Sequence, residues 1–357
     1  MERIRFERSV EKAAFFSPLA GMEFAEQTIE VRRDPLTGMT AVASSELATK
    51  EETFYGTTDW EYAGEIARTS RDGCFFCPER VMETTPRYPE HVVAGGRLQR
   101  GRALVFPNLF PLAALHAVVT YPELHFLRPS QFTPDLLEEG LGAAIDFAAR
   151  AERSYEGLEH LELCCNHMLP AGASLVHPHF QMFGGPGVPW LLRLMWECAA
   201  TFQAEHGVPY WRALVDEETE RGERFIAAKA GCTWLAPFAP TGGREVIAVL
   251  PGFGRIAELG DEQVAALAAG LSKVLAWYER EGLSAFNFSL GGGPLSGGPL
   301  AAGSAGHAVT LRIVARSAFK HEYRTDDYFL QKQLGGELIF ITPEEIAATL
   351  RPGFVAT

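Results

Sequence analysis

The chain has 357 residues and a formal net charge of −13, with 47% hydrophobic and 22% charged residues. This composition is ordinary for a globular enzyme, and the acidic balance disfavours sequence-independent nucleic-acid binding, which needs clustered lysine and arginine. No run of 18 apolar residues occurs, so we expect no membrane partner. The charged N-terminal segment lacks the apolar core of a signal peptide, which predicts a cytoplasmic protein.

The first half of the chain predicts an alternation of strands with one long helix. Apolar residues alternate around the turn sequence DPLTG, which predicts a β-hairpin over residues 28–44. The polar residues 46–72 predict a long loop. A helix over 133–155 is expected, with Thr133 as its N-cap and Pro134 at its first position. Strands are expected on both sides of this helix, at residues 102–110, 116–122, 161–169 and 174–183.

The second half repeats this order of strand, strand, helix, strand and strand, over residues 233–240, 245–251, 261–282, 285–294 and 307–317. Asn166 then matches Asn287, and His177 and His179 match Thr310 and Arg312. The pattern favours an internal duplication in which one copy keeps its chemical groups and the other has lost them. Glycine-rich residues 291–306 predict a flexible loop. Residues 342–351 predict a short helix whose capping box joins Thr342 and Glu345.

Two cysteines and a pair of histidines carry most of the chemical signal. Cys74 and Cys77 have the C-x2-C spacing of a zinc site, with His116, His125, His177 and His179 as candidates to complete the set. The alternative is a pair of small buried hydrophobic residues, since both residues between the cysteines are phenylalanine.

The segment SLVHPHFQMF places His177, His179 and Gln181 two residues apart, so in a strand all three would share one face. A neutral histidine can attack phosphorus, and a neighbouring amide can stabilise the phosphoryl oxygens. The alternative is a buried polar strand whose histidines are satisfied by the core. His116 and His167 are expected to be packing or surface residues.

The order of several motifs resembles the galactose-1-phosphate uridylyltransferase family of the histidine-triad superfamily. The family pattern N-x5-G-x-S-x2-H-P-H-x-Q matches a series of residues in register: Asn166, Gly172, Ser174, His177, Pro178, His179 and Gln181. Further similar segments are VRRDPLTGMTAVAS, GCFFC, FPNLFP, VVTYPELHF and TPEEIAATLR, which occur in the family's order along nearly the whole chain.

The resemblance implies a role for each matched residue. Cys74, Cys77, His125 and His177 would bind one structural zinc ion, and His179 would be the nucleophile. Gln181 would hydrogen-bond the transferred phosphoryl group. The remaining matches would contact the nucleotide: Asn166, Gly172 and Ser174 at the phosphates, and Phe106 and Asn108 at the base and ribose. A homodimer is also implied.

The expected fold is α+β, with two histidine-triad-like halves related by a pseudo-twofold axis, each an antiparallel sheet with packed helices. Residues 1–195 would hold the zinc site and the catalytic strand, and residues 196–357 would form the chemically degenerate half.

Three departures from the family limit what the resemblance implies. Two family arginines are replaced by Leu47 and Lys50 in ELATKE. The histidine-rich strand of the family's second metal site is TLRIVAR here, so that site is expected to be absent. The segment RTDDYFLQKQLGG has no clear match to the family's hexose-contacting residues.

The function expected from these observations is nucleotidyl transfer through a covalent nucleotidyl-histidine. A nucleoside monophosphate, UMP in the family, would pass from a nucleoside-diphosphate sugar to a sugar 1-phosphate. One alternative uses inorganic phosphate as the acceptor, giving an ADP-sugar or dinucleotide phosphorylase. Another is a zinc-stabilised nucleotide-binding module without catalysis.

Overall fold

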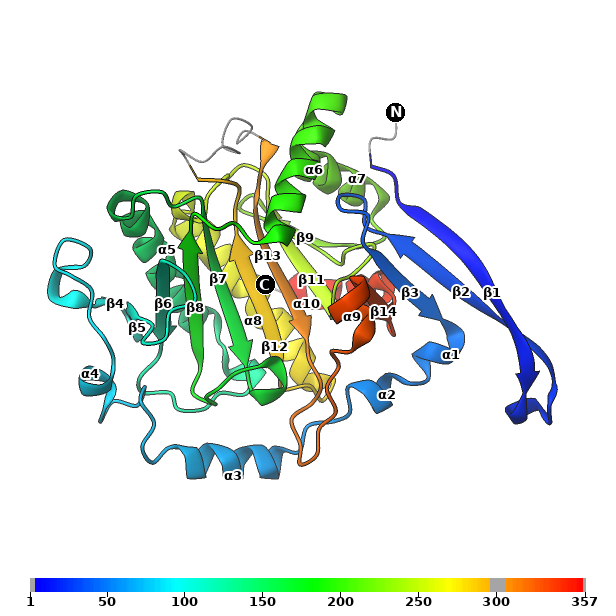
Figure 1. Ribbon diagram of the computed structural model, residues 1–357, viewed down its shortest axis with the longest axis horizontal. Helices are drawn as coiled ribbons and strands as arrows, with labels where there is room; N and C mark the ends of the chain where they lie inside the picture. Colours follow the sequence, from blue (N-terminus) through cyan, green and yellow to red (C-terminus); the bar gives the residue numbers. More distant parts are fainter. Residues whose placement is uncertain (1–3, 296–305, 356–357) are drawn as a thin grey trace.

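A ten-stranded antiparallel sheet forms the body of the computed structural model, which describes residues 4–295 and 306–355 (Figure 1). The strand order across this sheet is β4-β5-β6-β8-β7-β12-β13-β11-β10-β9. The strands from the first half of the chain are β4 Leu98–Arg100, β5 Ala103–Pro107, β6 Leu115–Thr120, β7 His160–His167 and β8 His179–Gly185. Those from the second half are β9 Phe225–Lys229, β10 Cys232–Leu235, β11 Gly243–Leu250, β12 Phe286–Gly291 and β13 Val309–Ala315.

Two long helices, α5 Pro134–Ser154 and α8 Asp261–Arg280, pack against each other and cover one face of this sheet. Thr133 caps α5 by accepting a hydrogen bond from Leu136 N, with Pro134 at the first position, as predicted. Alternate strand residues such as Phe180 and Met182 point into the core beneath these helices. Their neighbours His179 and Gln181 therefore lie on the opposite face, which we call the open face.

A smaller sheet lies beside the body, with the order β1-β2-β3-β14. It consists of β1 Glu7–Ser17, β2 Glu23–Arg33, β3 Thr40–Ser44 and β14 Gly336–Ile339. The predicted hairpin over 28–44 corresponds to β2 and β3, which pair antiparallel. The β1–β2 hairpin projects away from the body as an arm (blue in Figure 1).

The remaining helices are α1 Ser45–Ala48, α2 Glu51–Phe54, α3 Trp60–Ser70, α4 Val81–Thr84, α6 Trp190–His206, α7 Tyr210–Arg221, α9 Phe329–Leu334 and α10 Pro343–Val355. Of these, α10 matches the predicted C-terminal helix, and Thr342 and Glu345 form its capping box. None of the described helices is long and apolar enough to cross a membrane.

The loop predicted over residues 46–72 was wrong, because this segment contains α1, α2 and α3. Asp59 caps α3 by accepting from Tyr62 N, and Ala63 and Ile66 pack in a small cluster with Met168 and Val176. The charged residues within α3, Glu61, Glu65 and Arg68, lie on the exposed side of this short amphipathic helix. By this packing α3 supports the loop between β7 and β8.

The strand predicted over 174–183 begins only at His179, so His177 and Pro178 lie in the loop before β8. The predicted flexible loop 291–306 overlaps β12 at Gly291, and its residues 296–305 lie outside the described part of the chain.

The two predicted half-sheets are joined into one, because β7 pairs with β12. Asn166 lies directly opposite Asn287 in this ladder, as two residues on a local twofold axis would. The expected match of His179 to Arg312 is offset in the ladder. Asn166 follows Cys165, which pairs with Phe180, so Asn166 lies beside His179. Asn287 instead pairs with Val314, not with Arg312. The division into two related halves stays a prediction.

Candidate active site and metal centre

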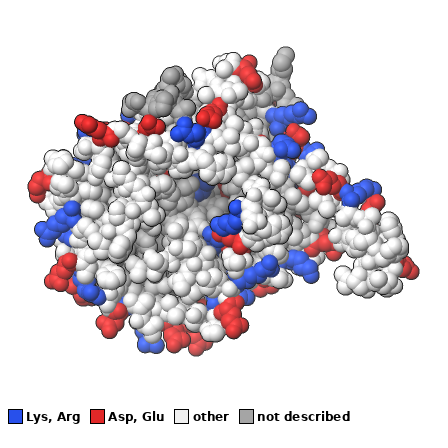
Figure 2. All heavy atoms as spheres, viewed as in Figure 1, with Lys and Arg blue, Asp and Glu red and all other residues white. Residues whose placement is uncertain are grey.

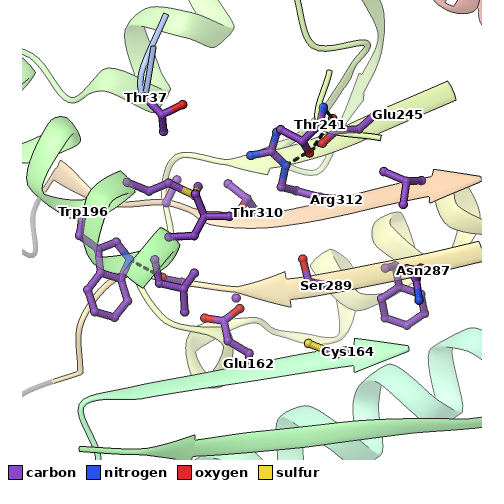
Figure 3. A pocket seen from close by; sticks show the side chains of 18 of the residues that line it. Thr37, Glu162, Cys164, Trp196, Thr241, Glu245, Asn287, Ser289, Thr310 and Arg312 are labelled. Atoms are coloured by element: carbon purple, nitrogen blue, oxygen red, sulfur yellow. Dashed lines mark hydrogen bonds and ion pairs between the residues drawn. The ribbon is translucent and has the colours of Figure 1, made fainter. Parts of the chain in front are cut away.

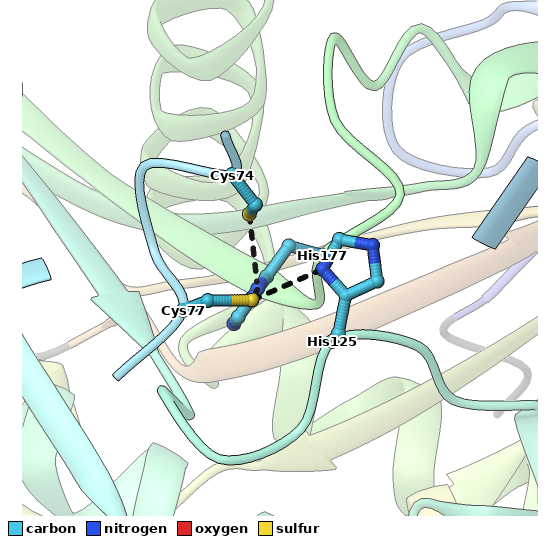
Figure 4. Close-up of side chains that lie close together, drawn as sticks. All are labelled: Cys74, Cys77, His125 and His177. Atoms are coloured by element: carbon cyan, nitrogen blue, oxygen red, sulfur yellow. Dashed lines mark hydrogen bonds between the residues drawn. The ribbon is translucent and has the colours of Figure 1, made fainter. Parts of the chain in front are cut away.

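Two cysteines and two histidines converge just before β8: Cys74, Cys77, His125 and His177 (Figure 4). All four are buried, and their ligand atoms lie within 4.8 Å of one another. Cys74 Sγ is 3.4 Å from His177 Nδ1, and Cys77 Sγ is 3.3 Å from His125 Nδ1. Tetrahedral zinc holds sulfur and nitrogen ligands about 3.5 Å apart, so this donor set fits a zinc ion.

The two histidines of this cluster are held in the form that binds metal. His177 Nε2 lies 3.1 Å from the carbonyl oxygen of Tyr121 and donates to it, which leaves the Nδ1 lone pair facing the cysteines. His125 Nε2 lies 3.1 Å from Ser70 Oγ. Burial lowers the pKa of His177 to about 3, so its ring is neutral at physiological pH.

The loop that carries the cysteines also covers the start of β8. Cys77 O accepts hydrogen bonds from Arg80 N and Val81 N, which fold the loop into α4. The ring of Phe76 then packs edge-on against His177 and His179, with ring centroids 5.7 and 5.5 Å apart. The phenylalanines between the cysteines are therefore compatible with a metal site, and one of them shields the histidine pair.

His179 is the first residue of β8 and is buried. Its Nδ1 lies 2.9 Å from the carbonyl oxygen of His177 and donates to it, so Nε2 keeps a free lone pair. Burial lowers the pKa of His179, and the hydrogen bond to His177 only partly opposes this shift. A neutral imidazole with one fixed tautomer is what a nucleophilic histidine requires.

Gln181 follows His179 on the open face and is oriented by His116. Leu112 N donates to His116 Nδ1 at 3.0 Å, so the proton of this ring sits on Nε2. That Nε2 lies 2.9 Å from Gln181 Oε1 and donates to it. The amide nitrogen of Gln181 forms no hydrogen bond within the described residues and can donate to a ligand. The expectation that His116 only packs or is exposed missed this contact, because sequence spacing does not reveal that β6 neighbours β8.

Asn166 lies beside His179 on β7, and a second asparagine holds it. Asn287 Nδ2 donates to Asn166 Oδ1 at 2.7 Å and to the carbonyl oxygen of Ala171 at 2.9 Å. Arg316 Nη1 donates to Asn287 Oδ1 at 2.6 Å. The amide nitrogen of Asn166 is thereby directed away from Asn287 and is available to a ligand.

The loop after β7 brings Gly172 close to Asn166. Gly172 has φ +86°, a conformation that favours glycine, and a Cβ there would lie 4.0 Å from Asn166 Nδ2. Both Gly172 and Ser174 are exposed on this loop. Asn166 therefore lies beside His179 with Gly172 next to it, and the phosphate contact expected of Ser174 stays a prediction.

The predicted base-contacting residues differ in their exposure. Phe106 is buried and packs edge-on against Phe76, so its ring is covered. Asn108 is half-buried and its Oδ1 accepts from Phe110 N at 2.9 Å. The next loop exposes large apolar side chains that the sequence reasoning did not single out, namely Leu109, Phe110 and Leu112.

The family's two arginine positions lie elsewhere in this chain. Leu47 is in α1 and Lys50 immediately precedes α2, and Figure 1 shows both helices across the molecule from β8. These two residues therefore do not reach His179 within one chain.

A cavity of about 380 Å³ opens on the open face beside these residues. Figure 2 shows this face hollowed near its centre, with acidic and basic side chains mixed around it. Cys164 and Asn166 of β7 both line the cavity. Figure 3 shows Cys164 on one side of it and Thr310 and Arg312 of β13 on the other. The lining does not include His179 or Gln181, which lie one strand away.

Solved structures share this fold. An ADP-glucose phosphorylase from Arabidopsis thaliana, solved with bound ADP-glucose, is 19% identical with a TM-score of 0.68, covering 90% of this chain and 98% of that one. A GalT-like protein from the same plant has a TM-score of 0.66 at the same identity and coverage. A uridylyltransferase has a TM-score of 0.63 at 20% identity, covering 91% of this chain and 98% of the other.

These likenesses confirm the expected α+β fold, which the chain shares with the GalT-like protein, the ADP-glucose phosphorylase and the uridylyltransferase. By sequence, the chain is 29% identical over 349 residues to a protein of Archaeoglobus fulgidus described only as uncharacterized, covering 98% of both chains. No protein-family model matches the sequence.

Proposed function

We propose that the protein transfers a nucleoside monophosphate from a nucleoside-diphosphate sugar to a second phosphate compound through a covalent intermediate on His179. The observation that carries the proposal is the state of this histidine. It is buried, burial lowers its pKa, its Nδ1–H is fixed on the carbonyl oxygen of His177, and its Nε2 has no hydrogen-bond partner among the described residues. This arrangement suits attack on phosphorus, because the Nε2 lone pair is available. A histidine with a purely packing role would have both ring nitrogens hydrogen-bonded.

In the first step His179 Nε2 attacks the α-phosphorus and forms an N–P bond. The bond from that phosphorus to the bridging oxygen breaks, and a sugar 1-phosphate leaves with the electron pair. In the second step an oxygen of the acceptor phosphate attacks the same phosphorus, and the N–P bond breaks to restore neutral His179. The Nδ1 proton stays on the ring, and the carbonyl oxygen of His177 stabilises the positive charge of the intermediate.

The neighbouring amides would bind the phosphoryl oxygens during both steps. Gln181 would donate from the amide nitrogen that His116 leaves free, and Asn166 from the nitrogen that Asn287 leaves free. Gly172 and Ser174 would contact the phosphates from the loop, and Asn108 would contact the nucleoside. His116 and Asn287 are then positioning residues, because they act through Gln181 and Asn166.

The cysteine–histidine cluster would hold one structural zinc ion. Zinc would cross-link three segments of the chain and would take no part in the reaction. His177, fixed in this way, would present its carbonyl oxygen to His179 Nδ1. We also propose a cytoplasmic location and a homodimer.

A second candidate uses inorganic phosphate as the acceptor. It is favoured by the fold shared with the ADP-glucose phosphorylase and by the loss of the two family arginines at Leu47 and Lys50. Adenine would then replace uracil as the base. The catalytic steps at His179 are the same for both candidates, and only the acceptor differs.

The test is the intact mass of the protein after incubation with a panel of UDP- and ADP-sugars. A gain of one uridylyl or adenylyl group supports the proposal and identifies the base. Discharge of this adduct by a sugar 1-phosphate, or by phosphate, then separates the two candidates. No gain with any donor would favour a nucleotide-binding module without catalysis.

A further inference from the structure

The cavity on the open face begins at β7, the strand next to the one that carries His179. Strands in a sheet lie about 4.8 Å apart. Asn166 on β7 is one strand from His179, Asn287 and Ser289 on β12 are two strands away, and Arg312 on β13 is three strands away. Measured across the strands, the cavity therefore starts about 5 Å from β8 and extends to about 14 Å from it. Glu162 pairs with Phe183, four residues along β8 from His179, so the Glu162 end of the cavity lies about 13 Å further along the strands. A group joined to the α-phosphorus through one further phosphate would enter the cavity at Asn166 and extend toward Glu162.

Two buried polar groups border the cavity without a hydrogen-bond partner among the described residues. Glu162 is 5% exposed, and its Oε1 has no partner. His307 is 6% exposed, and its Nδ1 has none. A buried polar atom without a partner is costly, so each such atom in a native protein calls for an explanation. Ligand hydroxyl groups, which both donate and accept, would satisfy both.

The charges around the cavity disfavour an anionic ligand. Arg312 Nε donates to Glu245 Oε1 at 2.7 Å, and the side chain of Glu245 is fully buried, so this pair is internally neutralised. Glu245 Oε2 also accepts from Thr241, and Asp34 Oδ1 accepts from the backbone and hydroxyl of Thr37. Burial raises the pKa of Glu162 well above its usual range, because the buried site disfavours the charged carboxylate. The charged groups of the lining then sum to a slight negative charge.

Aromatic walls complete the cavity. Trp196 from α6 and Trp211 from α7 line it, and Trp196 Nε1 donates to the carbonyl oxygen of Gly292 at 3.1 Å. Figure 3 shows Trp196 at one end of the cavity and the Arg312–Glu245 pair at the other. Indole rings pack well against the apolar faces of sugar rings. The volume of about 380 Å³ lies within the range of ligand sites in proteins.

We propose that this cavity binds the uncharged, hydroxylated sugar moiety of the donor, so that sugar specificity is built from residues of the same chain that carries His179. The inference rests on the proposed function. Glu162 and His307 would pair with sugar hydroxyls, Trp196 and Trp211 would contact the ring, and the free Nη atoms of Arg312 would donate to a ring or hydroxyl oxygen.

The test compares two donors on a variant that fills the cavity, Ser289→Leu. The wild type and this variant are incubated with a nucleoside-diphosphate sugar, and separately with the matching nucleoside diphosphate, which has no sugar. We expect the KM for nucleotidylation by the sugar donor to rise at least tenfold, with the rate from the sugar-free donor unchanged. Equal effects on both donors, or no effect on either, would overturn the inference. Ser289→Ala, which leaves the cavity open, is the matched control.

A second pair of variants at Glu162 separates hydrogen bonding from shape. Glu162→Gln keeps a neutral group that both donates and accepts and should retain the KM for the sugar donor within about threefold. Glu162→Leu should raise it at least tenfold. Equal KM values in the two variants would contradict the assigned contact.

Failure of the proposed function is distinguishable from failure of this inference. No adduct from any donor in the wild type would contradict nucleotidyl transfer alone. Sugar binding is then decided by the tryptophan fluorescence of the protein titrated with glucose and galactose. A saturable change that is at least tenfold weaker in Ser289→Leu supports the cavity assignment, and no change with either sugar overturns it.

Discussion

At the scale of single residues, the reactivity of His179 follows from its place on the strand. As the first residue of β8 it reaches back to the carbonyl oxygen of His177, which fixes the tautomer without any acidic partner. Burial beneath Phe76 keeps the ring neutral. An acidic orienting group would raise the basicity of the ring, whereas a carbonyl oxygen orients it and leaves it neutral.

Replacing His179 by alanine should remove the nucleophile and leave the fold intact, because the imidazole makes one hydrogen bond and that bond is to its own segment. The rate of transfer should fall on the order of 10⁴-fold or more. Steady-state turnover and circular dichroism of the same preparation measure the two effects. Wild-type turnover in the variant would exclude covalent catalysis at this residue.

His116→Ala should lower kcat about 10- to 100-fold, because Gln181 Oε1 then loses its 2.9 Å hydrogen bond and keeps only the longer one, of 3.5 Å, from Asn108 Nδ2. The KM should change less, since the nucleoside contacts remain. His160→Gln on β7 is the control, because His160 is buried at the end of its strand remote from His179. If His116→Ala behaves like this control, His116 has no positioning role.

Activity should be flat from neutral pH down to below the ordinary histidine pKa of about 6.5. Protonation of His179 abolishes nucleophilicity, and burial moves its pKa down, so the acid limb of kcat/KM moves to lower pH with it. A pH–rate profile measures this limb. An acid limb centred above pH 6.5 would contradict a buried neutral nucleophile.

His167 provides a stability test at a buried residue to which the proposed reaction assigns no role. Burial lowers its pKa to about 3 in the folded state, whereas the unfolded chain takes up a proton near pH 6.5. Stability due to neutral His167 is therefore present above pH 6.5 and is lost as pH falls from there toward 3, by up to about 1.4 kcal/mol per pH unit. In His167→Phe, denaturant unfolding should show a shallower loss between pH 6.5 and 4.5. Equal slopes in both proteins would refute this assignment.

At the scale of elements, the cysteine–histidine cluster joins three segments that are distant in sequence. These are the loop after α3, the segment after β6 and the residue pair that precedes β8. Because His177 of the cluster immediately precedes the start of β8, the position of His179 depends on the cluster.

Loss of one ligand should release this junction. Cys74→Ser should lower bound zinc from one ion per chain to well below one, lower the thermal midpoint by several degrees and reduce activity together with zinc content. Cys198→Ser is the matched control, since Cys198 is a free cysteine in α6 outside the cluster. Full zinc retention in Cys74→Ser, measured by elemental analysis, would argue against the metal centre.

Elements with strong local signals were predictable from the sequence. The turn DPLTG, the Thr133–Pro134 start of α5 and the Thr342–Glu345 box of α10 each depend on a few adjacent residues. The helix α3 was missed because the apolar residues that define its buried side are few, and they pack on Met168 and Val176 far along the chain. The early part of the expected strand 174–183 failed because Pro178 and the cluster at His177 keep that part out of the ladder.

In the site, too, features with a local sequence signal were predictable, and features that depend on contacts between distant segments were not. The cysteines and histidines were identifiable because their spacing along the chain is itself the signal. His116 and the cavity were not, since they depend on which strands become neighbours. Glu162, Ser289 and Arg312 meet only because β7, β12 and β13 are adjacent in the sheet.

At the scale of the whole molecule, the pairing of β7 with β12 makes one continuous surface out of both halves of the chain. The proposed nucleophile, His179, comes from the first half, whereas Asn287 and Arg316, which hold Asn166, come from the second. Residues of the second half of the chain therefore support a site residue of the first half.

The proposed homodimer belongs to this scale. The β1–β2 arm projects from the body and exposes apolar side chains at its tip, including Phe16 and Leu19, which its own chain does not cover. Such residues need a partner surface in water, and we expect a second copy to supply it. The double variant Phe16→Glu and Leu19→Glu should shift the protein from dimer to monomer in light scattering. A dimer that persists unchanged would exclude the arm, and a monomeric wild type would exclude the dimer.

The central claim, a covalent nucleotide on His179, is tested most directly by peptide mapping of the protein after brief exposure to the donor that gives the largest mass gain. We expect one nucleotidyl group, labile to acid, on the peptide that contains His179, with no modification of His116, His167 or His177. A nucleotide attached to any other residue, or an unmodified His179 in an active enzyme, would contradict it.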